Sequence, residues 1–246
     1  MISRFERAGI AVVALDRPQR HNALVPELLE ELVRELKIAA ASGRPVVLTG
    51  SATSFCPGAD LKWLGEFADP SQGVAELVAV HHLAILTLLE MPVPVIAAIN
   101  GPVAGGGLGL ALAADHRVAS TTASFTAAYF RLGLTPDGGS SAFLQLLIGR
   151  TRTLEMLLTN RRIDAQEALA WTLVNEVVEP SELLDRACGF ANSLEHVPHY
   201  ALRETRKLLD SINIRDQLQL ESVSIRTASR GQYFRDALRR FIDARP

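Results

Sequence analysis

The segment Pro94-Val95-Ile96-Ala97-Ala98-Ile99-Asn100-Gly101-Pro102-Val103-Ala104-Gly105-Gly106-Gly107 joins an apolar run to a glycine-rich turn. The apolar run predicts a buried strand over residues 93–99, since Pro92 ends the preceding segment. The turn leads into an Ala/Leu helix that extends to about Ala114. Strand, glycines and helix in this order are typical of loops that bind phosphate.

Two phosphate-binding motifs can be tested against this turn. A dinucleotide-binding fingerprint that starts at Gly105 requires a glycine at position 110, where the chain has Leu110. A nucleotide-binding P-loop that starts at Gly101 requires Lys and Ser or Thr after Gly106, where the chain has Gly107 and Leu108. Both motifs are therefore excluded.

Two interpretations of the glycines remain. They suit close packing of a helix on a sheet, and they also suit a helix N-terminus whose free N–H groups face an anionic oxygen. Such N–H groups stabilise a developing oxyanion as well as they bind a phosphate. An oxyanion site needs a second donor, and we expect it in the loop over residues 54–61, which follows a buried strand and opens a helix.

Strand and helix patterns alternate outward from this segment in both directions. Apolar runs predict strands over residues 8–15 and 46–50, and apolar residues at helical spacing predict helices around residues 28–36 and 74–89. This alternation continues to about Val177 and indicates an α/β chain with a mainly parallel sheet. Beyond Pro180 only helices are predicted, over residues 181–194, 198–209 and 217–241. We therefore divide the chain into a core over residues 1–190 and a helical C-terminal region over residues 191–246.

Composition excludes several classes of protein. The 246 residues carry 25 Lys+Arg and 27 Asp+Glu, a net charge of −2 without a basic run, which argues against nucleic acid or an anionic membrane as a partner. Cys56 and Cys188 form no paired motif, so neither a disulfide scaffold nor a zinc site is predicted. Prolines and glycines interrupt the apolar stretch over residues 91–114, and the N-terminus has no signal core. A cytoplasmic protein is expected.

Five motifs resemble the crotonase (enoyl-CoA hydratase/isomerase) superfamily. They are, in chain order, Arg17-Pro18 with Asn22-Ala23-Leu24; Phe55-Cys56-Pro57-Gly58-Ala59-Asp60-Leu61; the segment over residues 94–107; Leu132-Gly133-Leu134-Thr135-Pro136-Asp137-Gly138-Gly139; and Leu158-Thr159-Asn160-Arg161. Their order and spacing match the family over essentially the whole chain. The resemblance implies a ββα spiral core, a helical C-terminal region for trimerisation, and an acyl-CoA substrate without a further cofactor. A homotrimer or hexamer is expected.

The resemblance also implies catalytic positions. The backbone N–H groups of Ala59 and Gly106 correspond to the pair that holds the thioester oxygen. Gly109 and Tyr129 occupy the positions of the two hydratase glutamates, so a glutamate pair cannot activate water here. Asp137 lies where isomerase-type and dehalogenase-type relatives keep a catalytic aspartate. Burial in an acyl pocket is expected to raise its pKa and suit it to proton transfer, although a Pro-Asp-Gly turn is also a common structural use of Asp.

His82 corresponds to a catalytic histidine of the 4-chlorobenzoyl-CoA dehalogenases, although a histidine beside an apolar helical stripe is more often a packing residue. Those enzymes carry tryptophan at the position of Tyr129, which here lines the pocket or packs in the core. His81 and His82 are expected to point in different directions, and His196 and His199 have no third ligand nearby, so no metal site is predicted. The remaining substrate-binding candidates are Arg20, Asp60, Leu61, Lys62, Gly105 and Phe241.

The favoured function is isomerisation of an enoyl-CoA double bond, with Asp137 as the proton shuttle. Three alternatives remain open. One is a dehalogenase-like or hydrolytic reaction in which Asp137 is the nucleophile and His82 activates water. The others are hydration by a single carboxylate and acyl-CoA binding without catalysis.

Overall fold

The computed structural model describes residues 1–210 and 212–244, and residues 211, 245 and 246 of the predicted C-terminal region lie outside the described residues. Its main sheet has the strand order β1-β2-β3-β4-β6-β9. β1 and β2 are antiparallel and the other neighbours are parallel. These strands are β1 (Ile2–Arg7), β2 (Ile10–Leu15), β3 (Val46–Gly50), β4 (Val95–Ile99), β6 (His116–Ser120) and β9 (Glu176–Val178). The predicted α/β class is confirmed.

A second, smaller sheet stands beside the first. It consists of β5 (Pro102–Ala104), β7 (Ser124–Thr126) and β8 (Ile163–Asp164). β5 lies inside the glycine-rich turn and pairs with Cys56, so the predicted turn contains a short strand. This pairing brings the loop after β3 next to the start of α4 (Gly106–Leu112).

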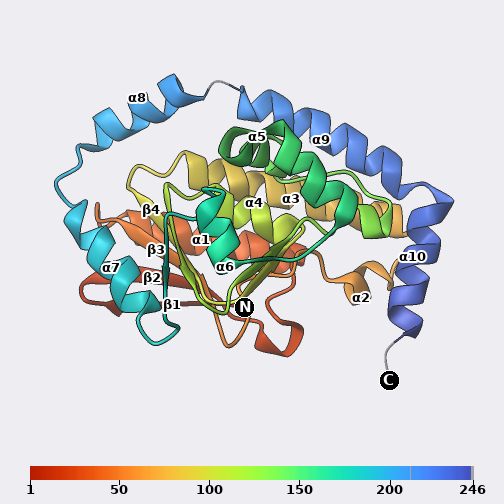
Figure 1. Cartoon of the computed structure of the whole chain (residues 1–246), viewed down its shortest axis with the longest axis horizontal. Helices are drawn as coiled ribbons and strands as arrows, with labels where there is room; N and C mark the ends of the chain where they lie inside the picture. The colour runs from red at the N-terminus through yellow and green to blue at the C-terminus, as the bar shows by residue number, and fades with distance from the viewer. Residues whose placement is uncertain (211, 245–246) are drawn as a thin grey trace.

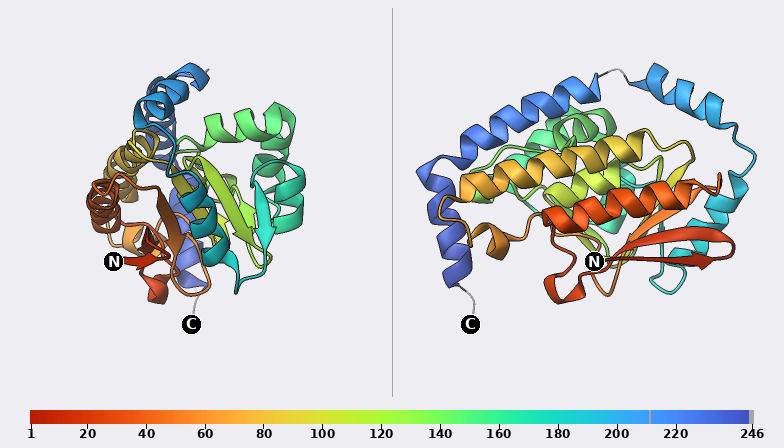
Figure 2. Two further views of the ribbon diagram at one scale, coloured as in Figure 1. Left: turned by 90° about the vertical axis from the view of Figure 1, so that its left-hand side faces the viewer. Right: turned by 180° about the vertical axis from the view of Figure 1, so that it is seen from behind.

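Helices cover both faces of the main sheet. Along β4, Val95, Ala97 and Ile99 pack toward α1 (Pro26–Ala40) and α3 (Pro70–Leu89), while Ile96 and Ala98 pack toward α7 (Leu183–Ser193). α1 and α3 run side by side (Figure 2, right). Both faces are therefore buried, which explains why the central strands are continuous apolar runs.

The remaining helices are α2 (Leu61–Leu64), α5 (Ser140–Thr159), α6 (Ala165–Ala170), α8 (His199–Leu209), α9 (Ile214–Ser229) and α10 (Gln232–Asp243), with two 3₁₀ turns, Pro18–Arg20 and Phe130–Leu132. α8, α9 and α10 form an arc around the outside of the molecule (Figure 1). α9 packs on α3 and α10 packs on α2. The last helices therefore reach the same elements that carry the predicted site.

Two predicted elements are wrong in detail. The helix predicted over residues 217–241 is two helices, α9 and α10, which turn at Gly231, the extended N-cap of α10. The strand predicted over residues 8–15 begins at Ile10, because Ala8 and Gly9 have positive φ and form the tight turn between β1 and β2. The division at residue 190 falls within α7, which packs on the main sheet.

α3 is long and apolar enough by composition to cross a membrane. It packs between α1 and α9, and its buried face contributes Val74, Val78, His81 and Ile85 to the interior. Core helices of globular proteins share this composition, and α3 occupies such a position here.

Candidate active site

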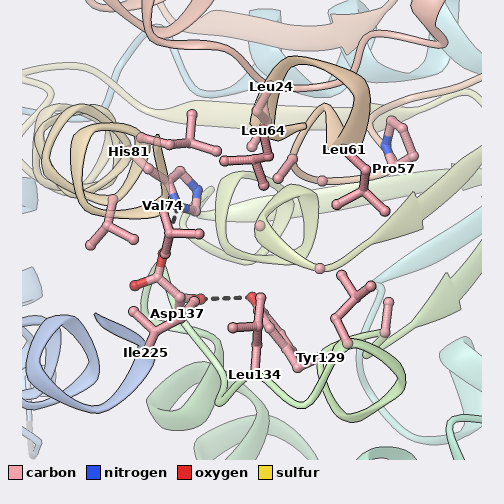
Figure 3. A pocket seen from close by; sticks show the side chains of 18 residues that line it. Leu24, Pro57, Leu61, Leu64, Val74, His81, Tyr129, Leu134, Asp137 and Ile225 are labelled. Carbon is pink, nitrogen blue, oxygen red and sulfur yellow. Dashed lines mark hydrogen bonds and ion pairs between the residues drawn. The ribbon is translucent and has the colours of Figure 1, made fainter. Parts of the chain in front are cut away.

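A cavity of about 140 Å³ lies where four segments meet: α3, the loop before α2, the start of α4 and the loop before α5. Most of its wall is aliphatic, and Figure 3 shows Leu24, Leu61, Leu64, Val74, Leu134 and Ile225 around it. The polar groups on the wall are backbone atoms and the side chains of His81, Tyr129 and Asp137. An apolar cavity with a few polar groups is typical of a site for a small molecule.

Ala59 and Gly106 line this cavity together, as predicted. Neither N–H donates a hydrogen bond to another described residue. Gly106 is the first residue of α4, where N–H groups lack helical partners. Ala59 lies between Gly58 and Asp60, which bond to the two sides of Leu24, so its own N–H faces away from that bridge. The cavity therefore has two free backbone donors.

Close approach of the two loops depends on Gly58. Its φ is +91°, and a Cβ there would lie 2.9 Å from the carbonyl oxygen of Ala104 and 3.2 Å from the nitrogen of Gly106. Gly105, at the N-cap of α4, also lines the cavity, but its N–H already donates to Thr126. The glycines thus serve both predicted purposes, packing and presentation of N–H groups.

Asp60 fixes the loop that carries Ala59. Its carboxylate accepts from the N–H groups of Lys62 and Trp63 and pairs with Arg17 at 2.6 Å. Burial opposes ionisation of Asp60, but these partners outweigh burial and lower its pKa. Asp60 does not line the cavity, so it positions the loop and does not contact a molecule bound in the cavity.

The other predicted binding residues differ in whether they line the cavity. Leu61 lines it. Arg20, in the 3₁₀ turn Pro18–Arg20, and the exposed Lys62 do not, and neither does the half-buried Phe241 of α10. Their part in substrate binding stays a prediction.

Asp137 lies buried on the cavity wall, between two histidines. Its Oδ1 is 2.5 Å from His82 Nε2 and its Oδ2 is 3.3 Å from His81 Nδ1. Burial by itself raises the pKa of this carboxyl, but the two imidazoles outweigh burial and hold the pKa well below its usual range. The expected rise in pKa is therefore wrong, because the sequence did not reveal both partners.

Both histidines reach Asp137, contrary to the expectation that they point in different directions. His81 contacts the carboxylate through Nδ1 and His82 through Nε2, and their ring centroids are 6.4 Å apart. His81 lines the cavity, whereas His82, on the far side of the carboxylate, does not. His81 was missed as a candidate, although it falls at helical spacing with the buried Val74, Val78 and Ile85. That spacing was the available signal.

The positions that resemble the hydratase glutamates carry no acid. The ring of Tyr129 lines the cavity, while its hydroxyl donates to the backbone carbonyl of Asp137 at 2.9 Å, and burial raises its pKa. A Cβ on Gly109 would lie 2.2 Å from the carbonyl oxygen of Gly138. With the Asp137 loop in this place, there is no room for a side chain at position 109.

Glu221, on α9, is a second residue that was missed. It is buried, and its carboxylate accepts from the N–H groups of Gly139 and Ser141 at 2.7 and 3.0 Å, which fixes the loop after Asp137. Burial and the nearby charge of Asp137 raise its pKa. The sequence holds no local signal for this contact, since 82 residues separate Glu221 from Gly139.

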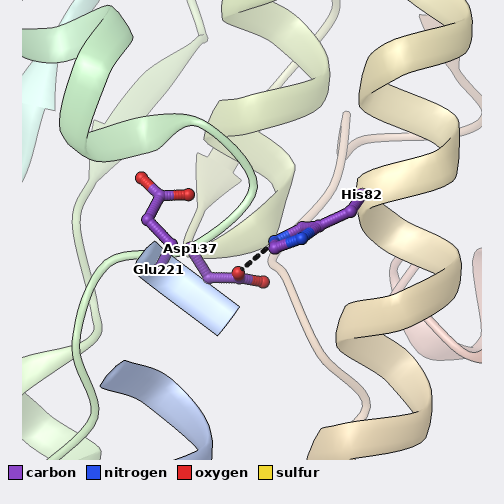
Figure 4. Close-up of side chains that lie close together, drawn as sticks. All are labelled: His82, Asp137 and Glu221. Carbon is purple, nitrogen blue, oxygen red and sulfur yellow. Dashed lines mark hydrogen bonds and ion pairs between the residues drawn. The ribbon is translucent and has the colours of Figure 1, made fainter. Parts of the chain in front are cut away.

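His82, Asp137 and Glu221 form a cluster of metal-ligand type, with ligand atoms within 4.8 Å of one another (Figure 4). Both carboxylates already accept hydrogen bonds, Asp137 from imidazoles and Glu221 from N–H groups. These bonds account for the arrangement. The predicted absence of a metal stays a prediction.

Comparison with known proteins places this geometry in a family. The family model described as enoyl-CoA hydratase/isomerase matches residues 6–237. A probable enoyl-CoA hydratase of Rhodobacter capsulatus is 34% identical over 97% of this chain and 93% of its own. A 4-chlorobenzoyl coenzyme A dehalogenase of an Arthrobacter species is 34% identical over 77% of this chain and 70% of its own. The 1,2-epoxyphenylacetyl-CoA isomerase of Escherichia coli is 30% identical over 100% of this chain and 96% of its own.

The fold agrees with these sequence relationships. The crystal structure of an enoyl-CoA hydratase from Bacillus halodurans superposes with a TM-score of 0.87 at 25% identity, over 97% of this chain and 98% of that one. The similar proteins are named for three different activities. Sequence similarity therefore identifies the family, and the reaction must be argued from the site. The chain belongs to the enoyl-CoA hydratase/isomerase family of the crotonase superfamily.

Proposed function

We propose that this protein isomerises the double bond of an enoyl-CoA thioester. One observation carries the proposal: a buried, ionised carboxylate with two imidazole partners lies in the same cavity as two free backbone N–H groups. The thioester oxygen binds to the N–H groups of Ala59 and Gly106. The acid/base cluster around Asp137 then moves a proton along the acyl chain.

The chemistry requires both parts. Removal of a proton alpha to the thioester carbonyl leaves an electron pair that delocalises onto the carbonyl oxygen. A preorganised N–H donor aimed at that oxygen lowers the barrier by about 3–4 kcal/mol. Return of the proton at the gamma carbon shifts the double bond, and atoms and charge balance without any co-reactant. No water takes part.

Isomerisation is favoured over hydration because Asp137 is the one carboxylate among the described residues that line the cavity. Position 129 is a tyrosine whose hydroxyl bonds to the backbone, and position 109 has no room for a side chain. A relative that is 30% identical is named as an isomerase of a CoA thioester, which fits this choice.

The size of the cavity favours a small acyl group. Its volume of about 140 Å³ is close to that of an engineered apolar cavity of about 150 Å³ that holds a benzene molecule. We therefore propose a short acyl chain or one with a single ring. On the family resemblance we also propose a homotrimer or hexamer in the cytoplasm, with no cofactor besides the CoA of the substrate.

A nucleophilic reaction is the second candidate, since Asp137 is ionised and His82 touches its other oxygen. The carboxylate would attack a carbon that bears a halide, the halide would leave, and water activated by histidine would hydrolyse the ester. A dehalogenase of a CoA thioester is 34% identical over 77% of this chain.

One panel of substrates separates these reactions. We expect the enzyme to convert short 3-enoyl-CoAs to 2-enoyl-CoAs, with a rate at least about 100-fold lower in Asp137→Asn and unchanged in the exposed control Asp16→Asn. Full activity of Asp137→Asn would refute the proposal. Chloride release from 4-chlorobenzoyl-CoA, hydration of 2-enoyl-CoA, or tight binding without turnover would each favour an alternative function instead.

A further inference from the structure

The imidazole of His81 has a free nitrogen in an apolar surrounding. Its ring lines the cavity and is 2% exposed, and among the described residues its Nε2 has no hydrogen-bond partner. A buried polar atom without a partner costs about 1–3 kcal/mol. Structures tolerate that cost where a ligand or a reaction uses the atom. His81 therefore needs an explanation beyond packing.

Asp137 determines the tautomer of His81. Its ionised carboxylate only accepts hydrogen bonds, so the nitrogen that faces it, Nδ1, carries the proton. In the neutral ring Nε2 then has a lone pair and no proton. This is the arrangement in which a carboxylate orients a histidine as a general base.

The surrounding backbone holds the ring in this orientation. A Cβ on Gly106 would lie 3.0 Å from His81 Cε1, so the ring packs directly against the residue that supplies an oxyanion donor. A Cβ on Gly138 would lie 2.1 Å from the same atom. The ring edge thus packs closely against both Gly106, which supplies the oxyanion donor, and Gly138 of the Asp137 loop.

We propose that His81 is the general base of this site and that Asp137 orients it. The proposal rests on the proposed function and names the atom that carries the proton. Nε2 takes the proton from the alpha carbon, and the electron pair passes to the thioester oxygen at Ala59 and Gly106. The same Nε2–H returns the proton at the gamma carbon. Asp137 stabilises the imidazolium in between.

The chemistry of the cluster supports His81 over Asp137 as the base. The imidazoles on both oxygens lower the proton affinity of the Asp137 carboxylate, whereas Nε2 of His81 has no hydrogen-bond partner among the described residues. The charged or titratable groups around the ring are Asp137, His82 on the same helix, Tyr129, and Glu221 beyond the carboxylate. Asp137 hydrogen-bonds to His81, and the centroid of the His82 ring lies 6.4 Å from that of His81.

The test uses proton exchange at the alpha carbon of a saturated short acyl-CoA in deuterated water, followed by NMR or mass spectrometry. This readout needs no isomerisation. We expect His81→Gln to lower the exchange rate about 100-fold or more, with the dissociation constant of the acyl-CoA changed less than threefold. The exposed histidine variant His196→Gln is the matched control and keeps the wild-type rate.

Chemical rescue provides a second measurement on a second variant. We expect added imidazole to restore part of the exchange rate in His81→Gly. Absence of any rescue by imidazole would overturn the proposal. So would a loss of less than tenfold in His81→Gln, or a loss explained entirely by weaker acyl-CoA binding.

Failure of this inference is distinguishable from failure of the proposed function. If the wild type exchanges the alpha proton through His81 but isomerises no enoyl-CoA, the function is wrong and the base assignment stands. If the wild type isomerises enoyl-CoAs and His81→Gln does so equally well, the base assignment alone is wrong.

Discussion

Substitution of Gly138 by alanine should damage both stability and catalysis, because it drives a methyl group into the His81 ring. The new Cβ would lie 2.1 Å from Cε1, 2.8 Å from Nδ1 and 2.9 Å from Nε2. Ordinary carbon contacts lie near 3.5–4.0 Å. The ring, held by Asp137 and clamped against Gly106, must therefore move by more than 1 Å or the loop must retreat.

Two contributions add to the energetic cost. The φ of Gly138 is +64°, and a side chain in the left-handed region costs about 1–2 kcal/mol. Overpacking of a buried site costs about 1–3 kcal/mol more. Gly43→Ala is a matched control, because Gly43 has a φ of +71° and its Cβ would meet only His199 Cε1 at 3.6 Å, an ordinary contact.

Thermal unfolding at one fixed protein concentration measures the difference. We expect Gly138→Ala to be less stable than Gly43→Ala by about 1–3 kcal/mol, roughly 2–12 °C in Tm for a chain of this size. A displacement of about 1 Å in a catalytic group costs about 100-fold in rate, so alpha-proton exchange should fall likewise in Gly138→Ala alone. Equal stability and equal rates in the two variants would refute the packing argument.

Three further predictions concern the carboxylates. Glu221→Gln puts an amide donor against the N–H groups of Gly139 or Ser141 and should cost about 1–3 kcal/mol in denaturant unfolding; an unfolding midpoint equal to that of the exposed control Glu30→Gln would contradict this. Asp60→Asn removes the partner of Arg17 and should raise KM and lower kcat through the Ala59 loop, and unchanged kinetics would argue against that positioning role. The lowered pKa of Asp137 stabilises the fold above its unfolded pKa near 4, and this contribution is lost as the pH falls below that value. The stability difference between wild type and Asp137→Asn should therefore shrink from pH 5 to pH 3, and a constant difference would count against it.

Local sequence patterns were sufficient for the fold and for part of the site. The apolar run before Asn100 and the glycines after it predicted β4 and α4, because both faces of the main sheet are buried and α4 requires close packing. Ala59 and Gly106 followed from motif positions, and they do line one cavity. These features depend on residues that are neighbours in the chain.

What the sequence could not predict depends on distant segments. The expected rise in the pKa of Asp137 considered burial but not its two imidazole partners, which lie 55 and 56 residues away. His81 appeared as one more member of a helix stripe, and its contact with Asp137 exists only because Gly138 leaves space for the ring. Glu221 reaches the loop from α9, beyond any local pattern.

The close packing of Gly109 and Gly138 explains why a glutamate does not fit at position 109. A Cβ on Gly109 would lie 2.2 Å from the carbonyl oxygen of Gly138, and a Cβ on Gly138 would lie 2.1 Å from His81. The backbone of α4 thus packs directly against the backbone of the Asp137 loop, and that loop packs directly against the ring of His81. A glutamate on α4 would push the loop outward and take Asp137 away from both imidazoles. A glutamate at position 109 and contact of Asp137 with both imidazoles are therefore alternative uses of the same space, and this chain has the second arrangement.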